Sequence, residues 1–300
     1  MLSMEKPKQS LPLKEAGSPG AKKNVKRFSY FLIFLFSYTC LHAQLYEQSV
    51  RTIVETLAAD SLEKAEKMIQ QTIQLEPTKK SNAILYQYLA EIYQRRGQNE
   101  KALEAYGKGI ELVPESPHLL LGRASLYLQT NNQERALADF NKVLESDADN
   151  EDALFFRAYI YTASRRYKEA RADYKHLLKL NPMHEDGRLG LAILCSKDGR
   201  PREAQEQIES LIQFYPTHAR HYLTRCGMYE QRREYEKAIK DANTAIELEP
   251  QNPDCYLTRA SLYLTMKKKG RASQDCRTAI SLGASADQVA SLLSQLRKSK

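Results

Sequence analysis

The chain has 300 residues, of which 42% are hydrophobic and 27% are charged. This composition excludes a disordered, collagen-like or wholly membrane-embedded protein. Only 12 glycines and 11 prolines are present, so a fold with many turns, such as a β-sandwich, is disfavoured and a helical protein is expected.

The net charge of +8 is concentrated near the N-terminus. Residues 1–27 contain seven basic and two acidic side chains, which leaves about +3 for the rest of the chain. A surplus this small does not indicate nucleic-acid binding, so no nucleic-acid partner is predicted.

The N-terminal segment has the pattern of a targeting sequence. Four basic residues at positions 22–27 precede an uncharged stretch over residues 28–41. As a helix these 14 residues would cover about 21 Å, less than the roughly 30 Å hydrocarbon core of a membrane. The pattern favours a signal peptide over residues 1–43, cleaved after Ala43, and hence a periplasmic or membrane-associated location in a bacterial cell envelope.

Two alternatives to cleavage stay open. Residues 28–43 could remain as an inner-membrane anchor, and Cys40 could carry a lipid, although Ser37, Tyr38 and Thr39 are unusual residues to precede a lipidated cysteine.

The rest of the chain is organised by an internal repeat. One alanine column has a first step of 37 residues and then five steps of 34, and prolines follow the same period. A second column of small residues lies three positions before a column of tyrosines. Small residues at fixed places allow two helices to approach closely. The three columns are Ala65, Ala102, Ala136, Ala170, Ala204, Ala238 and Ala272; Ala90, Ala124, Ala158, Ala192, Cys226 and Ala260; and Tyr93, Tyr127, Tyr161, Tyr229 and Tyr263.

This pattern resembles the tetratricopeptide repeat, a helix-turn-helix unit of 34 residues. Residues 83–116 match its signature with Tyr86, Leu89, Ala90, Tyr93, Ala102, Tyr106 and Pro114. The resemblance implies an all-α fold, a right-handed α-solenoid of about seven repeats with a C-terminal capping helix. The expected domains are the N-terminal segment 1–43, a degenerate first repeat 44–82, six repeats over 83–286 and the capping helix 287–300.

Local signals predict several helix starts. Ser116 and Asn252 each precede a proline, as N-cap residues do, and Asp60 with Glu63 has the spacing of a capping box. Ser285 and Gln288 form a similar box before the apolar residues Val289, Leu292, Leu293 and Leu296.

Four repeats depart from the signature in the same way. They carry an arginine where leucine is usual, and only these four carry an aspartate sixteen residues later. Because the two positions lie on facing helices of one repeat, this internal covariation predicts structural ion pairs. The predicted pairs are Arg123 with Asp139, Arg157 with Asp173, Arg225 with Asp241, and Arg259 with Asp275.

No catalytic constellation is recognisable, and we predict a protein that is not an enzyme and has no cofactor. His218 and His221 form a close pair, but the sequence indicates no third ligand, and both are expected at solvent-facing turns, so no metal site is predicted. Cys195, Cys226, Cys255 and Cys276 are expected to be buried thiols. A disulfide between Cys226 and either Cys195 or Cys255 stays open as an alternative.

Basic residues recur at the turn within each repeat. They could form an edge that faces anionic lipid or an acidic partner, although cations at the end of a helix also complement its dipole. This basic edge comprises Arg95, Arg96, Arg165, Arg166, Lys197, Arg200, Arg232, Arg233, Lys267, Lys268 and Lys269.

The resemblance places the binding surface on the concave face, at fixed positions of each first helix. The fifth and ninth positions include a succession of apolar side chains, which indicates an interface. The candidate groove comprises Gln87, Glu91, Leu121, Ser125, Phe155, Tyr159, Leu189, Ile193, Leu223 and Leu257. The chain's own C-terminal helix or a second copy of the chain could cover the groove, so a homo-oligomer stays open as an alternative. The groove positions lack the Lys and Asn of carboxylate-clamp co-chaperones, so that subclass is not predicted.

The leading hypothesis is therefore a scaffold or adaptor that captures a protein or peptide segment in the groove. The alternative is an accessory or regulatory subunit of an envelope enzyme or secretion complex, which would use the basic edge and could also contact a membrane surface.

Overall fold

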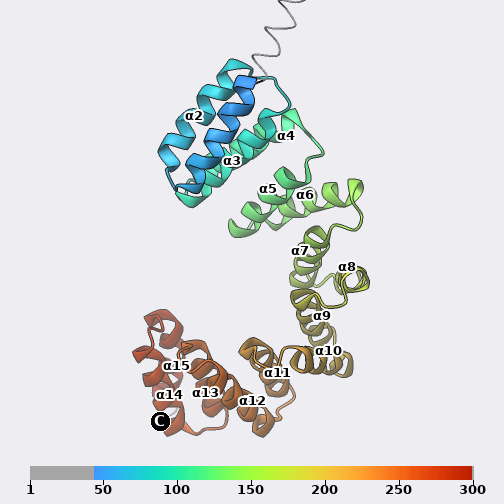
Figure 1. Cartoon of the computed structure of the whole chain (residues 1–300). Helices are drawn as coiled ribbons and strands as arrows, with labels where there is room; N and C mark the ends of the chain where they lie inside the picture. The colour runs from blue at the N-terminus through green and yellow to red at the C-terminus, as the bar shows by residue number, and fades with distance from the viewer. Residues whose placement is uncertain (1–43, 299–300) are drawn as a thin grey trace, which may run out of the picture. The chain divides into compact units, whose positions relative to one another are not determined.

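The structure, a computed structural model, describes residues 44–298, and these contain helices and no strand (Figure 1). The predicted signal or anchor over residues 1–43 lies outside the described residues. A helix over residues 44–58 comes first. It is followed by α2 (Leu62–Leu75), α3 (Asn82–Arg95), α4 (Asn99–Leu112), α5 (Pro117–Gln129), α6 (Gln133–Ser146), α7 (Glu151–Ala163), α8 (Tyr167–Leu180), α9 (Glu185–Lys197), α10 (Pro201–Phe214), α11 (Ala219–Gln231), α12 (Tyr235–Leu248), α13 (Pro253–Thr265), α14 (Lys269–Ser281) and α15 (Ala286–Lys298). The predicted all-α fold is confirmed.

The chain divides into two compact units, with the boundary after Leu112. The first contains the helix over residues 44–58 together with α2, α3 and α4, and the second contains α5 to α15. Within the second unit, α5 packs on α6, α7 on α8, α9 on α10, α11 on α12 and α13 on α14, and each pair contacts the next. Figure 1 shows these pairs following one another in chain order.

A left-handed turn position separates the two helices of six pairs. At this position φ lies between 59° and 69°, and the next residue donates its backbone N–H to a carbonyl five residues earlier, as in a Schellman motif. Glycine is the residue that adopts this conformation without strain, yet only two of the six positions have it. The six residues are Gly97, Asn131, Arg165, Gly199, Arg233 and Lys267.

The predicted columns of small residues form the contacts between helices. Every alanine of the first column and every member of the second, including Cys226, is at most 1% exposed. A side chain no larger than alanine or cysteine lets the helix axes approach, and the larger side chains beside it complete the packing. Phe140 and Tyr174 are among the largest fully buried side chains.

Most, but not all, of the predicted N-cap residues begin a helix. Ser116 and Asn252 are N-cap residues, and the Asn252 side chain accepts from the N–H of Asp254 at 3.0 Å. The prediction of a capping box at Asp60 is wrong, because the N-cap of α2 is Ser61 and Asp60 lies in the preceding turn with a φ of 53°. The short connection between the two helices forces this residue into the left-handed region.

The C-terminal helix α15 packs on α13 and α14. The N–H of Ser285 donates to Gln288 Oε1 at 2.8 Å, and the N–H of Gln288 donates to Ser285 Oγ at 3.3 Å, so the expected capping box forms. Val289 is buried and Leu292 packs beside Ala260 and Cys276. The side chains of Leu293 and Leu296 lie outside the described part of the chain.

Candidate functional site

The apolar positions predicted to line a groove lie on the first helix of successive pairs in the second unit. Leu121, Phe155, Leu189, Leu223 and Leu257 occupy one slot on α5, α7, α9, α11 and α13, and all five are half-buried. α7 contacts α9, α9 contacts α11, and α11 contacts α13, so the last four of these side chains belong to neighbouring helices. A row of half-buried apolar side chains leaves apolar surface available to a partner.

Phe155 contacts two other rings. Its ring lies 6.3 Å from that of Tyr174 and stacks on the His184 ring at 5.8 Å. Phe155 and Leu189 both pack against the buried core between α7 and α11. These two side chains therefore contribute to stability as well as to the surface.

Among the ninth positions, Tyr159 is the most accessible. Tyr159, one turn after Phe155 on α7, is 53% exposed, and Ser125 on α5 and Ile193 on α9 are half-buried. An exposed tyrosine on an apolar face is well suited to a protein interface, because its ring is apolar and its hydroxyl bonds to polar groups.

Gln87 and Glu91, the two predicted groove residues of the first unit, are polar and lie one turn apart on α3. Gln87 Nε2 donates to Glu91 Oε1 at 3.0 Å. This part of the surface therefore has a different chemistry from the apolar row of the second unit.

All four predicted Arg–Asp pairs are present, each within one helix pair. The arginine donates from Nε and Nη2 to the two carboxylate oxygens, at distances between 2.7 and 2.9 Å. The aspartates are at most 6% exposed. The hydrogen bond to the aspartate raises the pKa of each arginine, so each guanidinium keeps its charge. Their place between the helices gives them a structural role.

Two of the arginines also connect successive helix pairs. Nη1 of Arg157 donates to Asn141 Oδ1 on α6 at 3.0 Å, and Nη1 of Arg259 donates to Asn243 Oδ1 on α12 at 2.7 Å. The guanidinium of each of the four lies about 6 Å from the ring of the tyrosine four residues later, within range of a cation–π contact.

Carboxylates accompany much of the basic edge. Arg96 pairs with Glu66, Arg166 with Glu169 at 2.9 Å, Arg200 with Asp198 and Glu203 at 3.1 Å each, and Arg232 with Glu234 at 2.9 Å. Arg95 is 3.6 Å from Asp60. The edge is therefore less cationic than its arginines and lysines alone indicate.

A cavity of about 480 Å³ lies in the first unit, where the Arg–Asp pair is replaced by Leu89 and Ala105. Tyr93, Lys101 and Glu104 also line it. Sequence reasoning did not identify this cavity, although the departure of these two positions from the other repeats is a signal that the space between the helices changes.

The cysteines and histidines differ in how well the sequence placed them. Cys195, Cys226, Cys255 and Cys276 are buried free thiols. The expectation that both histidines of the close pair face solvent is wrong for His221, which is fully buried in α11. The helix turns this side chain inward, because it is the third residue of α11.

Family comparison agrees with this architecture. A tetratricopeptide repeat model matches residues 89–153 and 134–184, and a second tetratricopeptide repeat model matches residues 161–225. No match is found among curated proteins.

Solved structures give a wider match. A tetratricopeptide repeat protein from Parabacteroides merdae is 26% identical, with a TM-score of 0.74 over 85% of this chain and 99% of its own. PilF of Pseudomonas aeruginosa is 19% identical, with a TM-score of 0.55 over 72% of this chain and 99% of its own. Yeast Tom70 is 15% identical, with a TM-score of 0.54 over 80% of this chain and 59% of its own. The last two similarities concern the fold alone.

Proposed function

Because the chain belongs to the tetratricopeptide repeat family, whose members generally mediate protein–protein interactions, we propose that it is a non-enzymatic scaffold that binds a partner segment in its apolar groove. The observation that carries the proposal is the row of five half-buried apolar side chains on α5, α7, α9, α11 and α13. A partner with apolar residues at matching intervals, extended or helical, would cover this row.

The basic edge supports the alternative, an accessory subunit that binds an acidic partner, less well. Four of its arginines already have carboxylate partners within their own or the adjacent helix pair. An acidic partner would have to compete with these pairs.

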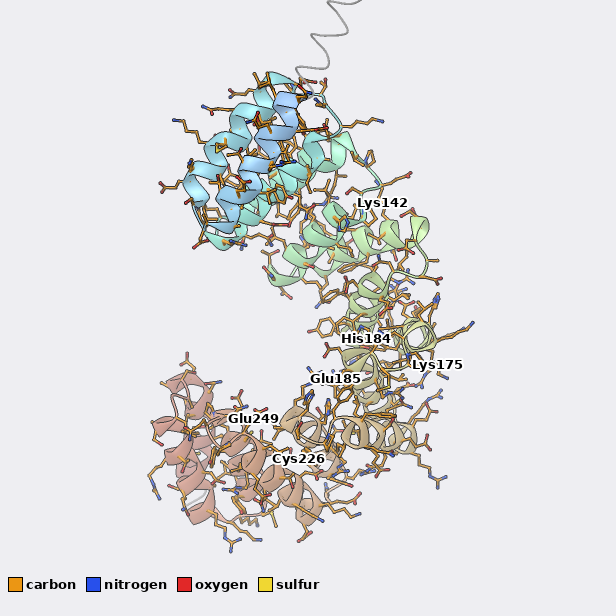
Figure 2. The ribbon with its side chains drawn as sticks, in the orientation of Figure 1. Lys142, Lys175, His184, Glu185, Cys226 and Glu249 are labelled. Carbon is orange, nitrogen blue, oxygen red and sulfur yellow. The ribbon has the colours of Figure 1, made fainter. Side chains whose placement is uncertain are left out.

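The groove is tested by site-specific photo-crosslinking in the native host. A photoreactive phenylalanine replaces the exposed Tyr159 on α7, and the matched control replaces Lys175, which is exposed on α8 (Figure 2). We expect a discrete crosslinked partner from position 159 and none from position 175. Crosslinks of equal yield from both positions would contradict binding in the groove.

Tyr159→Glu is the variant that separates binding from folding. Changing both Phe155 and Leu189 to glutamate would also remove core packing, whereas the side chain of Tyr159 is mostly outside the core. Binding should be lost in the Tyr159→Glu variant with the helical content unchanged. Binding that weakens steeply with salt and is unaffected by this change would instead favour the basic edge.

We further propose export to the cell envelope, on the basis of the basic and apolar pattern of residues 1–43. Among the described residues, no helix has the length and apolar character required to cross a membrane. Intact-mass measurement of the protein from separated soluble and membrane fractions tests this. A soluble species that begins at Gln44 supports export with cleavage, and a full-length membrane-bound species supports an anchor.

A further inference from the structure

Three potential metal-binding side chains converge where α9 contacts α11. Glu185 is the first residue of α9, His218 is the N-cap of α11, and His221 lies in the first turn of α11. Their ligand atoms lie within 4.8 Å of one another. Oε1 of Glu185 is 2.9 Å from Nδ1 of His218 and 3.0 Å from Nε2 of His221.

The burial of His221 sets this cluster apart from a surface group of polar residues. The side chain is fully buried, and neither ring nitrogen has a hydrogen bond of good geometry, although Nε2 is close to Glu185. A buried nitrogen without a partner is costly. A metal ion bound by Nε2 would give this nitrogen a directed partner in place of its poorly aligned contact with Glu185.

The electrostatic state of His221 is compatible with a ligand role. Desolvation lowers the pKa of its imidazole, even though the charge of Glu185 acts in the opposite direction. A metal-binding imidazole is neutral, and this desolvation acts in that direction.

The preceding repeat provides an internal comparison. The same three slots hold Glu151, His184 and Gly187, and Nδ1 of His184 accepts the N–H of Gly187 at 3.0 Å as a helix cap. A Cβ added at Gly187 would lie 2.7 Å from Leu177 Cδ2, so this repeat lacks space for a second histidine. His218 makes no such capping bond, and its Nδ1 faces the carboxylate instead.

We propose that Glu185, His218 and His221 form a Zn²⁺-binding site. Two imidazole nitrogens and one carboxylate oxygen are ligands that Zn²⁺ accepts, and three protein ligands leave a fourth position for water or a partner's side chain. Bonds of about 2.0–2.1 Å place tetrahedral ligand atoms roughly 3.4 Å apart, so Glu185 would move away from each histidine by a few tenths of an ångström, and the two histidine nitrogens, which lie within 4.8 Å of one another, would take up the same spacing.

Arg220 is the cation that zinc would displace from the cluster. Its Nη2 lies 2.7 Å from Glu185 Oε1 and 2.6 Å from Asp186 Oδ1. Asp186 can retain the guanidinium when Glu185 turns to the metal, which keeps this positive charge paired.

A metal at this place would connect two helices that line the groove. Leu189 lies on α9 and Leu223 on α11, so a bound ion would hold the spacing of two neighbouring side chains of the apolar row. The site itself rests on the three ligands and is independent of the groove's function.

The test is calorimetric titration of the full chain with Zn²⁺ at pH 7.5, using protein purified without a polyhistidine tag. We expect one ion per chain, and a loss of affinity of about tenfold or more in His218→Ala and in Glu185→Gln. Both side chains are partly exposed, so these variants are expected to fold. His184→Ala, in the matching slot of the preceding repeat, should change the affinity less than about twofold.

Substitution with Co²⁺ distinguishes these ligands from the four cysteines. We expect absorption bands of a tetrahedral site without thiolate charge transfer. The proposal is wrong if 1 mM Zn²⁺ produces no saturable binding, if His218→Ala binds as tightly as the unmodified chain, or if thiolate bands appear.

Discussion

The Arg157–Asp173 pair allows the predicted ion pairing to be tested by measuring the coupling free energy between the two residues. Arg157→Leu removes two charge-assisted hydrogen bonds of 2.8 Å and leaves the carboxylate of Asp173, which is 6% exposed, without a cationic partner. Breaking a buried pair in this way typically costs about 3–5 kcal/mol. The Arg157 side chain is 22% exposed, so water can partly replace it, and we expect a loss of about 2–4 kcal/mol of unfolding free energy.

The second step of the cycle is Asp173→Ala in the same chain. The double variant has leucine and alanine at the two positions, the combination that Leu89 and Ala105 provide in an earlier repeat. It removes the isolated carboxylate, so we expect it to be more stable than Arg157→Leu alone. The matched surface control is Lys108→Ala, which breaks an exposed pair with Glu104 and should change stability little.

Urea-induced unfolding followed by circular dichroism gives the unfolding free energy of the unmodified chain, the two single variants and the double variant. The slopes of free energy against urea concentration are compared, because a repeat array can unfold in steps. Additivity of the two single changes within about 0.5 kcal/mol would refute the idea that the pair acts as a unit.

Two further predictions concern small residues of the helices. Gly190→Ala should destabilise the protein by about 1–3 kcal/mol, because the added Cβ would lie 2.5 Å from the ring of the buried Tyr174. Gly227→Ala has open space around the added Cβ and should stabilise the protein by about 0.5–1 kcal/mol. Equal shifts of the melting temperature in the two variants would contradict this packing. Burial raises the pKa of the Cys226 thiol to about 12, so at pH 8 this thiol should react with a thiol reagent only after unfolding. Because the unfolded thiol ionises near pH 8.5, the stability that this shift contributes is present below that pH and is lost as the pH rises toward 12; Cys226→Ala should remove this loss, as melting temperatures at pH 7 and pH 10 would show.

Much of the architecture was predictable because each repeat has the same packing requirements at the same positions, so the required residue types recur in the sequence. The alanine columns predicted which positions needed small side chains, and the structure buries all of them. The Arg–Asp pairs were predictable for a related reason: four repeats have both residues and two have neither, which amounts to an internal comparison within one sequence.

Positions that depend on backbone conformation were less predictable. Asp60 has the spacing of a capping residue, but the turn places it at a φ of 53° and Ser61 becomes the N-cap. Arg165 and Arg233 occupy the same left-handed turn position as Gly97, because the hydrogen bonds of the turn determine the backbone there and outweigh the local preference of the residue.

The sequence by itself determined the helical class, the period and the repeated buried positions of the helices, because all of these depend on spacing along one or two adjacent helices. The tertiary structure alone decided that Glu185 meets His218 and His221. The carboxylate comes from the preceding helix pair, more than thirty residues earlier, and its contact with the histidines depends on how α9 packs against α11. Spacing in the sequence does not record this packing, because the side chains between the two helices determine it.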